Sequence, residues 1–385
     1  MNERISAYLA ERIAANDFPS AVYLVAEKGE IVFHDALGNA VVEPELIPAK
    51  LDTIYDLASL TKPLVTGLLA TRLVERNLIN LDDDAGHILT NAPHAVASQA
   101  TLGDLATHRS GYPAWMPFYL LPGAPPFDPE DYGSSSANID RICEYVRETI
   151  LRFEARGHAP VVYSDLNFIL IGFILELFSD LPLATQQLEI NERLRLQRTL
   201  FRGPGAPNHE TAASEFGNRY ERQTCIEKFP ELGVSESAFR NYQIWGEVHD
   251  GNAYFMGGVA GHAGLFSTAE EVFKIALQFL PEHTKLLKPE TCELFRTNFT
   301  PGMNEDRSFA FQLASTKDST AGTRMSPESF GHNGFTGTSL WIDPVKDRIF
   351  VLLTNRTHAH PLPFVNINSV RRRFHDLAIE ELEKN

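Results

Sequence analysis

The sequence has few cysteines, no excess of basic residues and no long apolar run, and each absence excludes a class of protein. Its three cysteines lie far apart, without the CxxC or Cys/His spacing of a zinc site, and we expect them to be reduced and buried. With 34 basic against 50 acidic side chains the formal net charge is -16, and such a surface repels nucleic acid and anionic lipid. No apolar run approaches the roughly 20 residues that span a bilayer, so we expect no membrane insertion.

The N-terminal residues alternate charged and apolar side chains at helical spacing and lack the apolar segment of a secretory signal. A cytoplasmic protein is therefore predicted. The composition that is present, 43% hydrophobic and 22% charged, is typical of a folded globular chain. A length of 385 residues suits two or three units of roughly 150 residues, or one large α/β enzyme.

Hydrophobic periodicity predicts strands at both ends of the chain and helices between them. Alternating residues indicate two strands, 21–29 and 30–38, joined by a turn at Lys28-Gly29. The other predicted elements are strands at 308–315, 338–344 and 347–355 and helices at 2–16, 64–74, 168–178 and 367–384. The helix at 168–178 is the most apolar segment, and it is too short for a membrane span, so a buried core helix is predicted.

This order of elements predicts an α/β (α+β) fold in which distant segments of the chain build one sheet. Residues 1–80 and 260–385 are expected to form a mixed antiparallel sheet flanked by helices. Residues 81–259 are expected to form an inserted, mainly helical domain, because Pro/Gly-rich loops interrupt their helical periodicity.

One serine in the sequence is followed by a lysine three residues later, in Ser59-Leu60-Thr61-Lys62. Residues i and i+3 of a helix lie about 5 to 6 Å apart on one face, so this hydroxyl and this amine can meet. A serine needs an adjacent base to attack a carbonyl, and a desolvated lysine can serve as that base. The same spacing also occurs by chance, so the interpretation depends on further motifs.

Two further motifs follow in order, Tyr163-Ser164-Asp165 just ahead of the apolar helix and His332-Asn333-Gly334 near the end. With the serine-lysine pair they resemble the active-site elements of the penicillin-recognising serine hydrolases, which include class C β-lactamases, DD-peptidases and related esterases. Segments 53–62, 101–113 and 257–272 also resemble stretches of that family. The resemblance covers nearly the whole chain and implies a β-lactamase/transpeptidase-like fold.

The resemblance also implies roles in catalysis. Ser59 would be the nucleophile that forms an acyl-enzyme with an ester or amide. Lys62 would take the serine proton or hold Tyr163 as a phenolate, and Tyr163 would pass a proton to the leaving group; which of the two is the base stays open. The backbone N–H groups of Ser59 and Phe335 would stabilise the oxyanion, and one such donor is worth about 2.7 to 4 kcal/mol of barrier.

Two positions depart from the motifs of class C β-lactamases. Asp165 stands where asparagine is usual, and His332 replaces a lysine, as in DD-peptidases and esterases of the group. An aspartate cannot donate an amide N–H to a substrate carbonyl, so efficient β-lactam hydrolysis is not expected. Asp165 would hydrogen-bond Lys62 or face a cationic substrate group, and His332 would donate to Tyr163 or to a substrate carboxylate. Gly334 would allow close approach of a ligand, or it would only mark a bulge.

Other polar and aromatic residues carry less specific signals. Glu247, His249, Asp250 and His262 have the composition of a metal site, but their spacing favours structural or substrate-lining roles, so we predict no metal and no cofactor. Three aromatic residues after Ser110-Gly111 are expected either to wall the cleft or to pack in the core: Trp115, Phe118 and Tyr119. His358 and His360 are expected in a solvated loop. Arg371–Arg373 are expected on a solvated helix face or in contact with nearby acids.

The sequence therefore predicts a serine hydrolase that works through an acyl-enzyme on a small-molecule or short-peptide substrate. Hydrolysis of small esters or D-amino-acid peptides ranks above hydrolysis of β-lactams. The GxSxG and GxxxxGK patterns are missing, which disfavours an α/β-hydrolase and a nucleotide hydrolase. The alternative is a non-catalytic scaffold or binding protein that retains the fold.

Overall fold

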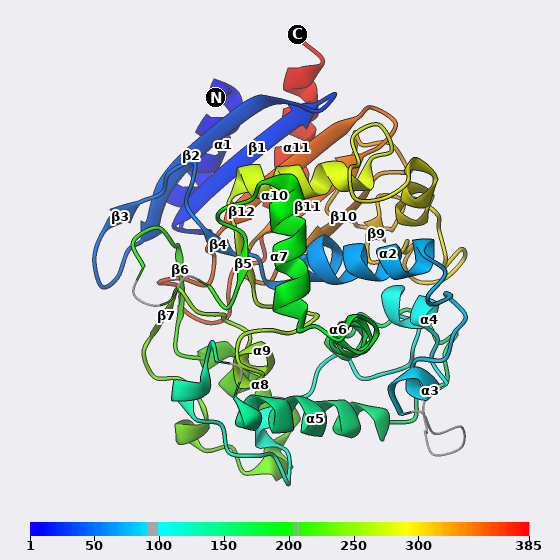
Figure 1. Cartoon of the computed structure of the whole chain (residues 1–385). Helices are drawn as coiled ribbons and strands as arrows, with labels where there is room; N and C mark the ends of the chain where they lie inside the picture. The colour runs from blue at the N-terminus through cyan, green and yellow to red at the C-terminus, as the bar shows by residue number, and fades with distance from the viewer. Residues whose placement is uncertain (91–98, 135, 204, 206–207, 385) are drawn as a thin grey trace.

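A seven-stranded sheet brings the two ends of the chain together (Figure 1). In the computed structural model, which describes residues 1–90, 99–134, 136–203, 205 and 208–384, the strand order is β3-β2-β1-β12-β11-β10-β9 and the pairings are antiparallel. The strands are β1 (Ser20–Glu27), β2 (Glu30–Val41), β3 (Ile47–Pro48), β9 (Gln312–Leu313), β10 (Phe330–Asn333), β11 (Ser339–Asp343) and β12 (Arg348–Thr354). Because β1 pairs directly with β12, the antiparallel sheet predicted from distant segments is confirmed.

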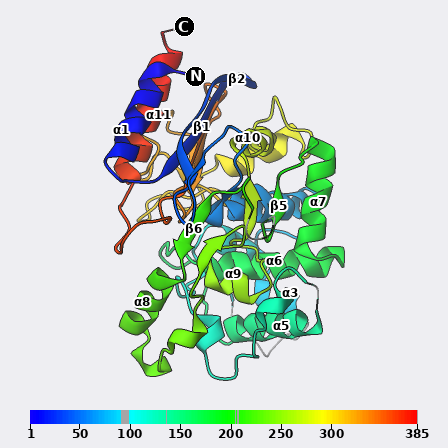
Figure 2. The same ribbon diagram turned by 90° about the vertical axis from the view of Figure 1, so that its left-hand side faces the viewer.

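Side chains of the central strands alternate between two buried faces. Tyr23 of β1 lies in the smaller core with Phe374, whereas its neighbours Val22 and Leu24 lie in the larger core. The helices that cover the sheet are α1 (Glu3–Ala14), α10 (Ala269–Ala276) and α11 (Asn368–Leu382). Figure 2 shows α1 and α11 on one side of the sheet and α10 on the other. The predicted terminal helices are thus confirmed as a layer of the sheet domain.

The hairpin between β1 and β2 turns at Lys28 and Gly29, as predicted. These two residues have φ values of 53° and 76°, and a two-residue turn with positive φ at both central positions matches the twist of the flanking strands. The predicted strands near 338–344 and 347–355 are also confirmed, as β11 and β12.

The predicted strand at 308–315 is wrong, because only its residues Gln312–Leu313 pair with the sheet. Ala310 has a φ of 66°, and the N–H of Ser308 donates to the carbonyl of Phe311. The segment therefore turns back on itself. Its alternating aromatic residues, which suggested a strand, are buried in a cluster of phenylalanines instead.

The middle of the chain is mainly helical, with two small sheets. Its helices are α2 (Leu68–Glu75), α3 (Ala85–Thr90), α4 (Leu102–Ala106), α5 (Ala137–Leu151), α6 (Asp165–Ser179), α7 (Leu183–Leu194), α8 (Arg219–Lys228) and α9 (Gly251–Phe255). The short strands are β4 (Tyr55–Asp56), β5 (Leu200–Phe201), β6 (Ala213–Phe216), β7 (Gln243–Trp245) and β8 (Leu265–Ser267). Since β8 pairs with both β4 and β5, backbone hydrogen bonds join the two segments that were predicted as separate domains. The division at residues 80 and 260 stays a prediction.

Helix α6 is the buried core helix that the apolar segment predicted. The side chains from Leu166 to Leu175 are buried, and only the C-terminal end, with Leu177 and Phe178, is exposed. Within the described residues, no helix by itself has the length and apolar character needed to cross a membrane; α6 and α7 meet that test only as a pair bent by 78°.

The loop between α9 and β8 packs against α6 through glycine. A Cβ on Gly261 would lie 2.0 Å from the carbonyl oxygen of Phe168 and 3.1 Å from the Cα of Gly172. The carbonyl of Gly261 also accepts a hydrogen bond of 2.7 Å from the Thr66 hydroxyl. Because both neighbours of the missing Cβ are backbone atoms, neither can move aside cheaply.

The substitution Gly261→Ala is therefore expected to lower the free energy of unfolding by about 3 kcal/mol, since it overpacks a rigid contact. Urea denaturation measures this loss. Gly123→Ala is the matched control: Gly123 has a φ of 85°, and a Cβ at this position would have no other atom within 4 Å, so only a backbone cost of about 1 kcal/mol is expected. Equal losses in the two variants would contradict the role given to the α6 contact.

Candidate active site

Ser59 lies at a turn whose backbone is held in an unusual conformation. It follows Ala58, which is buried and has a φ of 47°, a conformation that costs a non-glycine residue about 1 to 3 kcal/mol. The carboxylate of Asp56 accepts the N–H of Ala58 at 2.8 Å through one oxygen and the N–H of His249 at 2.8 Å through the other. Asp56 thus fixes the strained turn from which the serine projects.

Lys62 stands on a π-helical turn, Lys62–Gly67, rather than on the regular helix predicted from residue 64. The N–H of Leu68 donates to the carbonyl of Pro63, five residues back, which is the hydrogen bond of a π turn. Regular α-helix begins only with α2. The turn buries Lys62 completely and places its side chain toward Ser59.

The ammonium of Lys62 lies within 3.1 Å of polar atoms from three different residues. Nζ lies 2.9 Å from Ser59 Oγ, 3.1 Å from the carbonyl oxygen of His262 and 2.7 Å from Asp165 Oδ1. A lysine ammonium has three donors and no acceptor, so this arrangement fits the charged form. The predicted contact between Asp165 and Lys62 is present as an ion pair.

The phenol of Tyr163 lies against the same lysine. Lys62 Nζ is 5.0 Å from the centroid of the Tyr163 ring, and the Tyr163 hydroxyl interacts with both Lys62 and Ser59. Burial raises the pKa of Tyr163 above its ordinary value, although the charge of Lys62 lowers it. Burial alone would lower the pKa of Lys62, but Asp165 and Tyr163 outweigh it and raise the pKa. Because Tyr163 is neutral near pH 7, Asp165 is the group that keeps Lys62 protonated there.

His332 presents an acceptor to the cavity. Its Nδ1 lies 3.0 Å from the carbonyl oxygen of Asn333, which can only accept, so Nδ1 carries the proton. Its Nε2 is buried without a hydrogen-bond partner. Burial, followed by the charges of Lys62 and Arg307, lowers the pKa of His332 well below its ordinary value. The neutral ring therefore offers a lone pair, whereas the sequence suggested a donor to Tyr163 or to a carboxylate.

Hydrogen bonds join the turn after β10 to the segment that precedes Ser59. The hydroxyls of Thr336 and Thr338 donate to the carbonyls of Asp56 and Leu57, at 2.7 and 3.0 Å. A Cβ on Gly334 would lie 2.0 Å from Thr338 Oγ1 and 2.6 Å from the carbonyl oxygen of Leu57. The close approach expected at Gly334 is thus an approach of the protein's own backbone, which brings the turn carrying Phe335 beside the serine turn.

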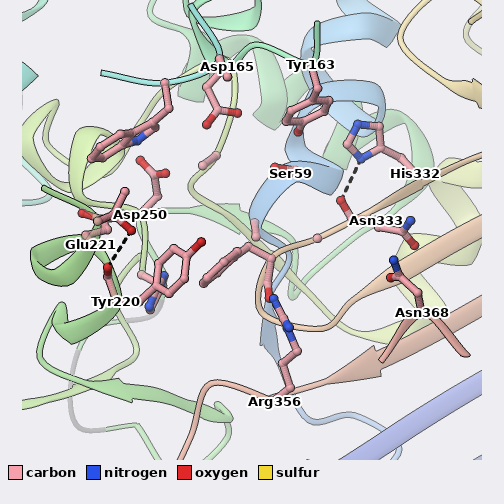
Figure 3. A pocket seen from close by; sticks show the side chains of 18 of the residues that line it. Ser59, Tyr163, Asp165, Tyr220, Glu221, Asp250, His332, Asn333, Arg356 and Asn368 are labelled. Atoms are coloured by element: carbon pink, nitrogen blue, oxygen red, sulfur yellow. Dashed lines mark hydrogen bonds between the residues drawn. The ribbon is translucent and has the colours of Figure 1, made fainter. Parts of the chain in front are cut away.

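One cavity of about 510 Å³ joins these elements. Six of the seven residues predicted for the site line it: Ser59, Tyr163, Asp165, His332, Gly334 and Phe335. Lys62 lies behind Ser59 at hydrogen-bonding distance. Figure 3 shows Tyr163, Asp165 and His332 around Ser59, although the residues come from segments more than 100 positions apart in the sequence.

Sequence reasoning missed the arginines of this cavity. Arg371, which was expected on a solvated face, is 5% exposed and donates to the carbonyls of Gly334 and Thr338 at 2.9 Å each. Arg356 Nε donates to the carbonyl of Phe335 at 2.7 Å, and its guanidinium lies 5.0 Å from the Phe335 ring. In the described part of the chain neither arginine forms a salt bridge. Burial, together with the charge of Arg356, lowers the pKa of Arg371 to about 9.

His358 and His360 were also expected in solvent, and that prediction is wrong. Both are buried. His358 Nε2 accepts the N–H of Val42 at 2.8 Å, and its Nδ1 lies 2.9 Å from the carbonyl of Ser214. His358 thus joins the end of β2 to β6, and His360 Nε2 lies 2.7 Å from the carbonyl oxygen of Asn16, so their role is in packing and hydrogen bonding. Of the predicted aromatic wall, Trp115 lines the cavity, whereas Phe118 is buried in the core.

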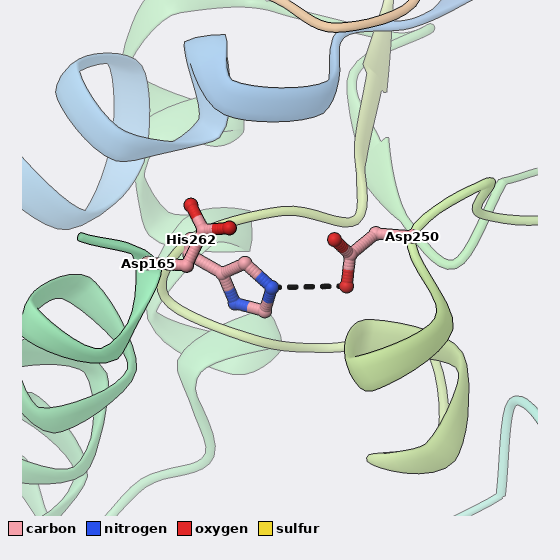
Figure 4. A group of neighbouring side chains, drawn as sticks. All are labelled: Asp165, Asp250 and His262. Atoms are coloured by element: carbon pink, nitrogen blue, oxygen red, sulfur yellow. Dashed lines mark hydrogen bonds and ion pairs between the residues drawn. The ribbon is translucent and has the colours of Figure 1, made fainter. Parts of the chain in front are cut away.

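The acidic stretch that suggested a metal site divides into separate ion pairs. Glu247 pairs with Arg240 at 3.1 Å, His249 with Glu215 at 2.9 Å, and Asp250 with His262 at 3.0 Å. Asp165, Asp250 and His262 do bring ligand-type atoms within 4.8 Å of one another (Figure 4). The Lys62 ammonium, 2.7 Å from Asp165, already supplies positive charge there and would repel a metal ion, so the structural interpretation is the better one.

Comparison with known proteins places this arrangement in a family. A model of the Beta-lactamase family matches residues 5–371. A putative D-alanyl-D-alanine carboxypeptidase of Escherichia coli strain K12 is 30% identical over 366 residues, which cover 89% of this chain and 79% of that protein. An N-acetylmuramyl-L-alanine amidase of Bacillus subtilis strain 168 is 30% identical over 378 residues, which cover 91% of this chain and 80% of that protein.

Among solved structures, the octameric penicillin-binding protein homologue from Pyrococcus abyssi superimposes with a TM-score of 0.69 at 18% identity. That superposition covers 98% of this chain and 77% of the other, and it shows a shared β-lactamase/transpeptidase-like fold. The family match spans nearly the whole sequence, and the fold agrees with it. The chain therefore belongs to the Beta-lactamase family and is a hydrolase of that family.

Proposed function

We propose that the protein is a serine peptidase that removes the C-terminal residue of short peptides through an acyl-enzyme on Ser59. The observation that carries this proposal is the convergence of Ser59, Lys62 and Tyr163 on one cavity, with the serine hydroxyl 2.9 Å from a buried ammonium. A nucleophile, a proton-transfer group and a charged orienting group within hydrogen-bonding reach are what acyl transfer requires.

The distribution of protons supports Tyr163 as the general base. Removing one proton from the resting pair gives either charged Lys62 with a Tyr163 phenolate, or neutral Lys62 with a neutral phenol; both forms carry the same number of protons. Asp165 touches Lys62 at 2.7 Å and therefore favours the form in which Lys62 keeps its charge. We assign proton transfer to Tyr163 and orientation to Lys62.

The proposed reaction then balances as follows. In the form with a charged Lys62 and a Tyr163 phenolate, Ser59 Oγ bonds to the substrate carbonyl carbon while the phenolate takes the hydroxyl proton, and the N–H groups of Ser59 and Phe335 hold the oxyanion. The carbon-nitrogen bond breaks as Tyr163 returns that proton to the leaving amine. Water repeats the sequence on the acyl-enzyme and releases the acid. His332 Nε2, as an acceptor, suits a substrate N–H.

The arginines of the cavity favour a substrate with a carboxylate. Arg356 and Arg371 line the cavity and form no salt bridge in the described part of the chain, and a buried guanidinium is stabilised by a paired anion. A peptide with a free C-terminus supplies one, whereas a simple ester does not. The similar Escherichia coli protein bears the name of a putative D-alanyl-D-alanine carboxypeptidase, which supports D-amino-acid peptides as the class.

The three cysteines are free and two are buried, which supports a reducing, cytoplasmic location.

Replacing the nucleophile tests the proposal against a non-catalytic scaffold. We expect Ser59→Ala to lower kcat/KM for D-alanyl-D-alanine peptides and for p-nitrophenyl acetate by at least about 10³-fold, because the acyl-enzyme cannot form. Ser237→Ala, at an exposed serine, is the control and should behave as the wild type. Equal turnover by Ser59→Ala and wild type would defeat the proposal, and no turnover by the wild type would favour the scaffold.

Asp165→Asn tests the charge assignment. Asp165 raises the pKa values of both Lys62 and Tyr163, so removing its charge lowers both values. On the acidic limb, the activity then appears at a lower pH, because Tyr163 loses its proton more easily. On the alkaline limb, the activity disappears at a lower pH, because Lys62 loses its charge more easily. We expect both limbs of the kcat/KM profile to move down by about 1 to 2 pH units. If neither limb of the kcat/KM profile moves in Asp165→Asn, Asp165 does not control this titration.

A further inference from the structure

Glu221, Arg356 and Arg371 line the cavity but form no salt bridge in the described part of the chain. Glu221, Asp250 and Asp165 line one part, and Arg356 and Arg371 line another. In Figure 3 the three carboxylates lie to one side of Ser59, and Arg356 lies away from them toward Asn368. A buried charge without a partner keeps its desolvation cost, so a ligand that carries both charges would offset the cost on both sides.

Glu221 is held in place without a counter-charge. It is 6% exposed; Oε1 accepts the N–H of Gly251 at 2.8 Å, and Oε2 accepts the hydroxyl of Tyr119 at 2.9 Å. A Cβ on Gly251 would lie 2.1 Å from Glu221 Oε2, so this position needs glycine for the carboxylate to fit. No salt bridge to Glu221 occurs in the described ranges. The neighbouring His249 is paired with Glu215 instead.

Asp250 adds a second negative charge near Glu221. Burial, followed by the charge of Asp250, raises the pKa of Glu221 to about 7, as expected for a carboxylate that lacks a cation. Asp250 uses Oδ1 for His262 and for the N–H of Ala253, and its side chain keeps 21% of its surface exposed. Lys228 also lines the cavity but is exposed and forms no salt bridge with either acid in the part of the chain that the structure describes.

On the other side of the cavity, two arginines have no ion-pair partner among the described residues. Arg371 is 5% exposed, and its Nε has no hydrogen-bond partner among the residues that the structure describes. A buried donor without a partner costs about 1 to 3 kcal/mol. Arg307, a third arginine on the lining, is neutralised by Glu305 at 2.6 Å. Among the described residues, Arg356 and Arg371 are therefore cations without an ion-pair partner, and Glu221 is an acid without one. Asp250, already paired with His262, adds negative charge beside Glu221.

We propose that Glu221 and Asp250 form a subsite for a primary ammonium group on the acyl part of the substrate, opposite the carboxylate held by Arg356 and Arg371. The inference rests on the proposed function and specifies its substrate class: zwitterionic short peptides whose scissile carbonyl lies between the two charges, over Ser59. A cavity of about 510 Å³ lies within the size range of small-ligand pockets. The ammonium comes either from the peptide's own N-terminus or from a lysine-type side chain.

Three peptides that carry the ammonium at the N-terminus, nowhere or on a side chain provide the test: D-alanyl-D-alanine, Nα-acetyl-D-alanyl-D-alanine and Nα-acetyl-D-lysyl-D-alanine. Release of D-alanine gives kcat/KM for each. We expect the wild type to prefer at least one ammonium-bearing peptide over the acetylated neutral one by about tenfold or more, and the preferred peptide identifies which ammonium is bound. Glu221→Gln should reduce that ratio to within about threefold of one, because it removes the charge and keeps the shape.

Glu227→Gln, at an exposed position of the same helix, is the control and should keep the wild-type ratio. If Glu221→Gln fails to fold, the wild type alone can provide the comparison. D-alaninamide and Nα-acetyl-D-alaninamide are then tested as inhibitors of p-nitrophenyl acetate turnover, and stronger inhibition by the free amine is expected. Peptide turnover without a preference for the ammonium, or an unchanged ratio in Glu221→Gln, overturns the subsite alone. No turnover of any peptide or ester overturns the proposed function with it.

Discussion

The buried ion pair between Lys62 and Asp165 is the interaction on which the site depends. Placing an ammonium out of contact with water costs several kcal/mol unless its donors are satisfied and its charge is balanced. Here Ser59 and the backbone carbonyl of His262 accept two of its donors, and the carboxylate of Asp165, 2.7 Å away, balances its charge. Those partners come from the serine turn, from the loop before β8 and from the start of α6, so a single side chain fixes the relative positions of three remote segments. The same ion pair favours the charged form of Lys62 beside the Ser59 hydroxyl and the Tyr163 phenol.

The sheet and the glycine contacts hold these three segments in place. Pairing of β1 with β12 closes the sheet between the two ends of the chain, and the turn after β10 is tied to the serine turn by the hydroxyls of Thr336 and Thr338. On the other side, Gly261 lets the loop that carries His262 pack directly on the backbone of α6. The geometry of the cavity is thus a consequence of backbone packing, and its electrostatics follow from the few charged groups that this packing leaves inside.

Motif and periodicity predicted the parts of the fold that are decided locally. The hairpin at Lys28-Gly29 and the core helix α6 follow from turn chemistry and apolar pattern, whereas the contact between Asp165 and Lys62 was expected only from the resemblance of their motifs to those of a known family. The failures are positions where tertiary contacts override the pattern. Residues 308–315 alternate as a strand does, yet Ala310 turns the chain. The charge run at Arg371 and the histidines at His358 and His360 look solvated, but hydrogen bonds to remote carbonyls offset the cost of their burial. Glu221 gave no signal in the sequence, because its significance arises from the absence of a counter-charge around it.

The account rests most directly on where the acyl group is attached. Incubating the protein with an activated acyl donor, stopping the reaction in acid and mapping the modified peptide by mass spectrometry would locate the covalent intermediate. The account predicts one added acyl group per chain, on Ser59, in the wild type and none in Ser59→Ala. An acyl group on another side chain, or ester turnover that continues with no adduct on Ser59, would contradict it.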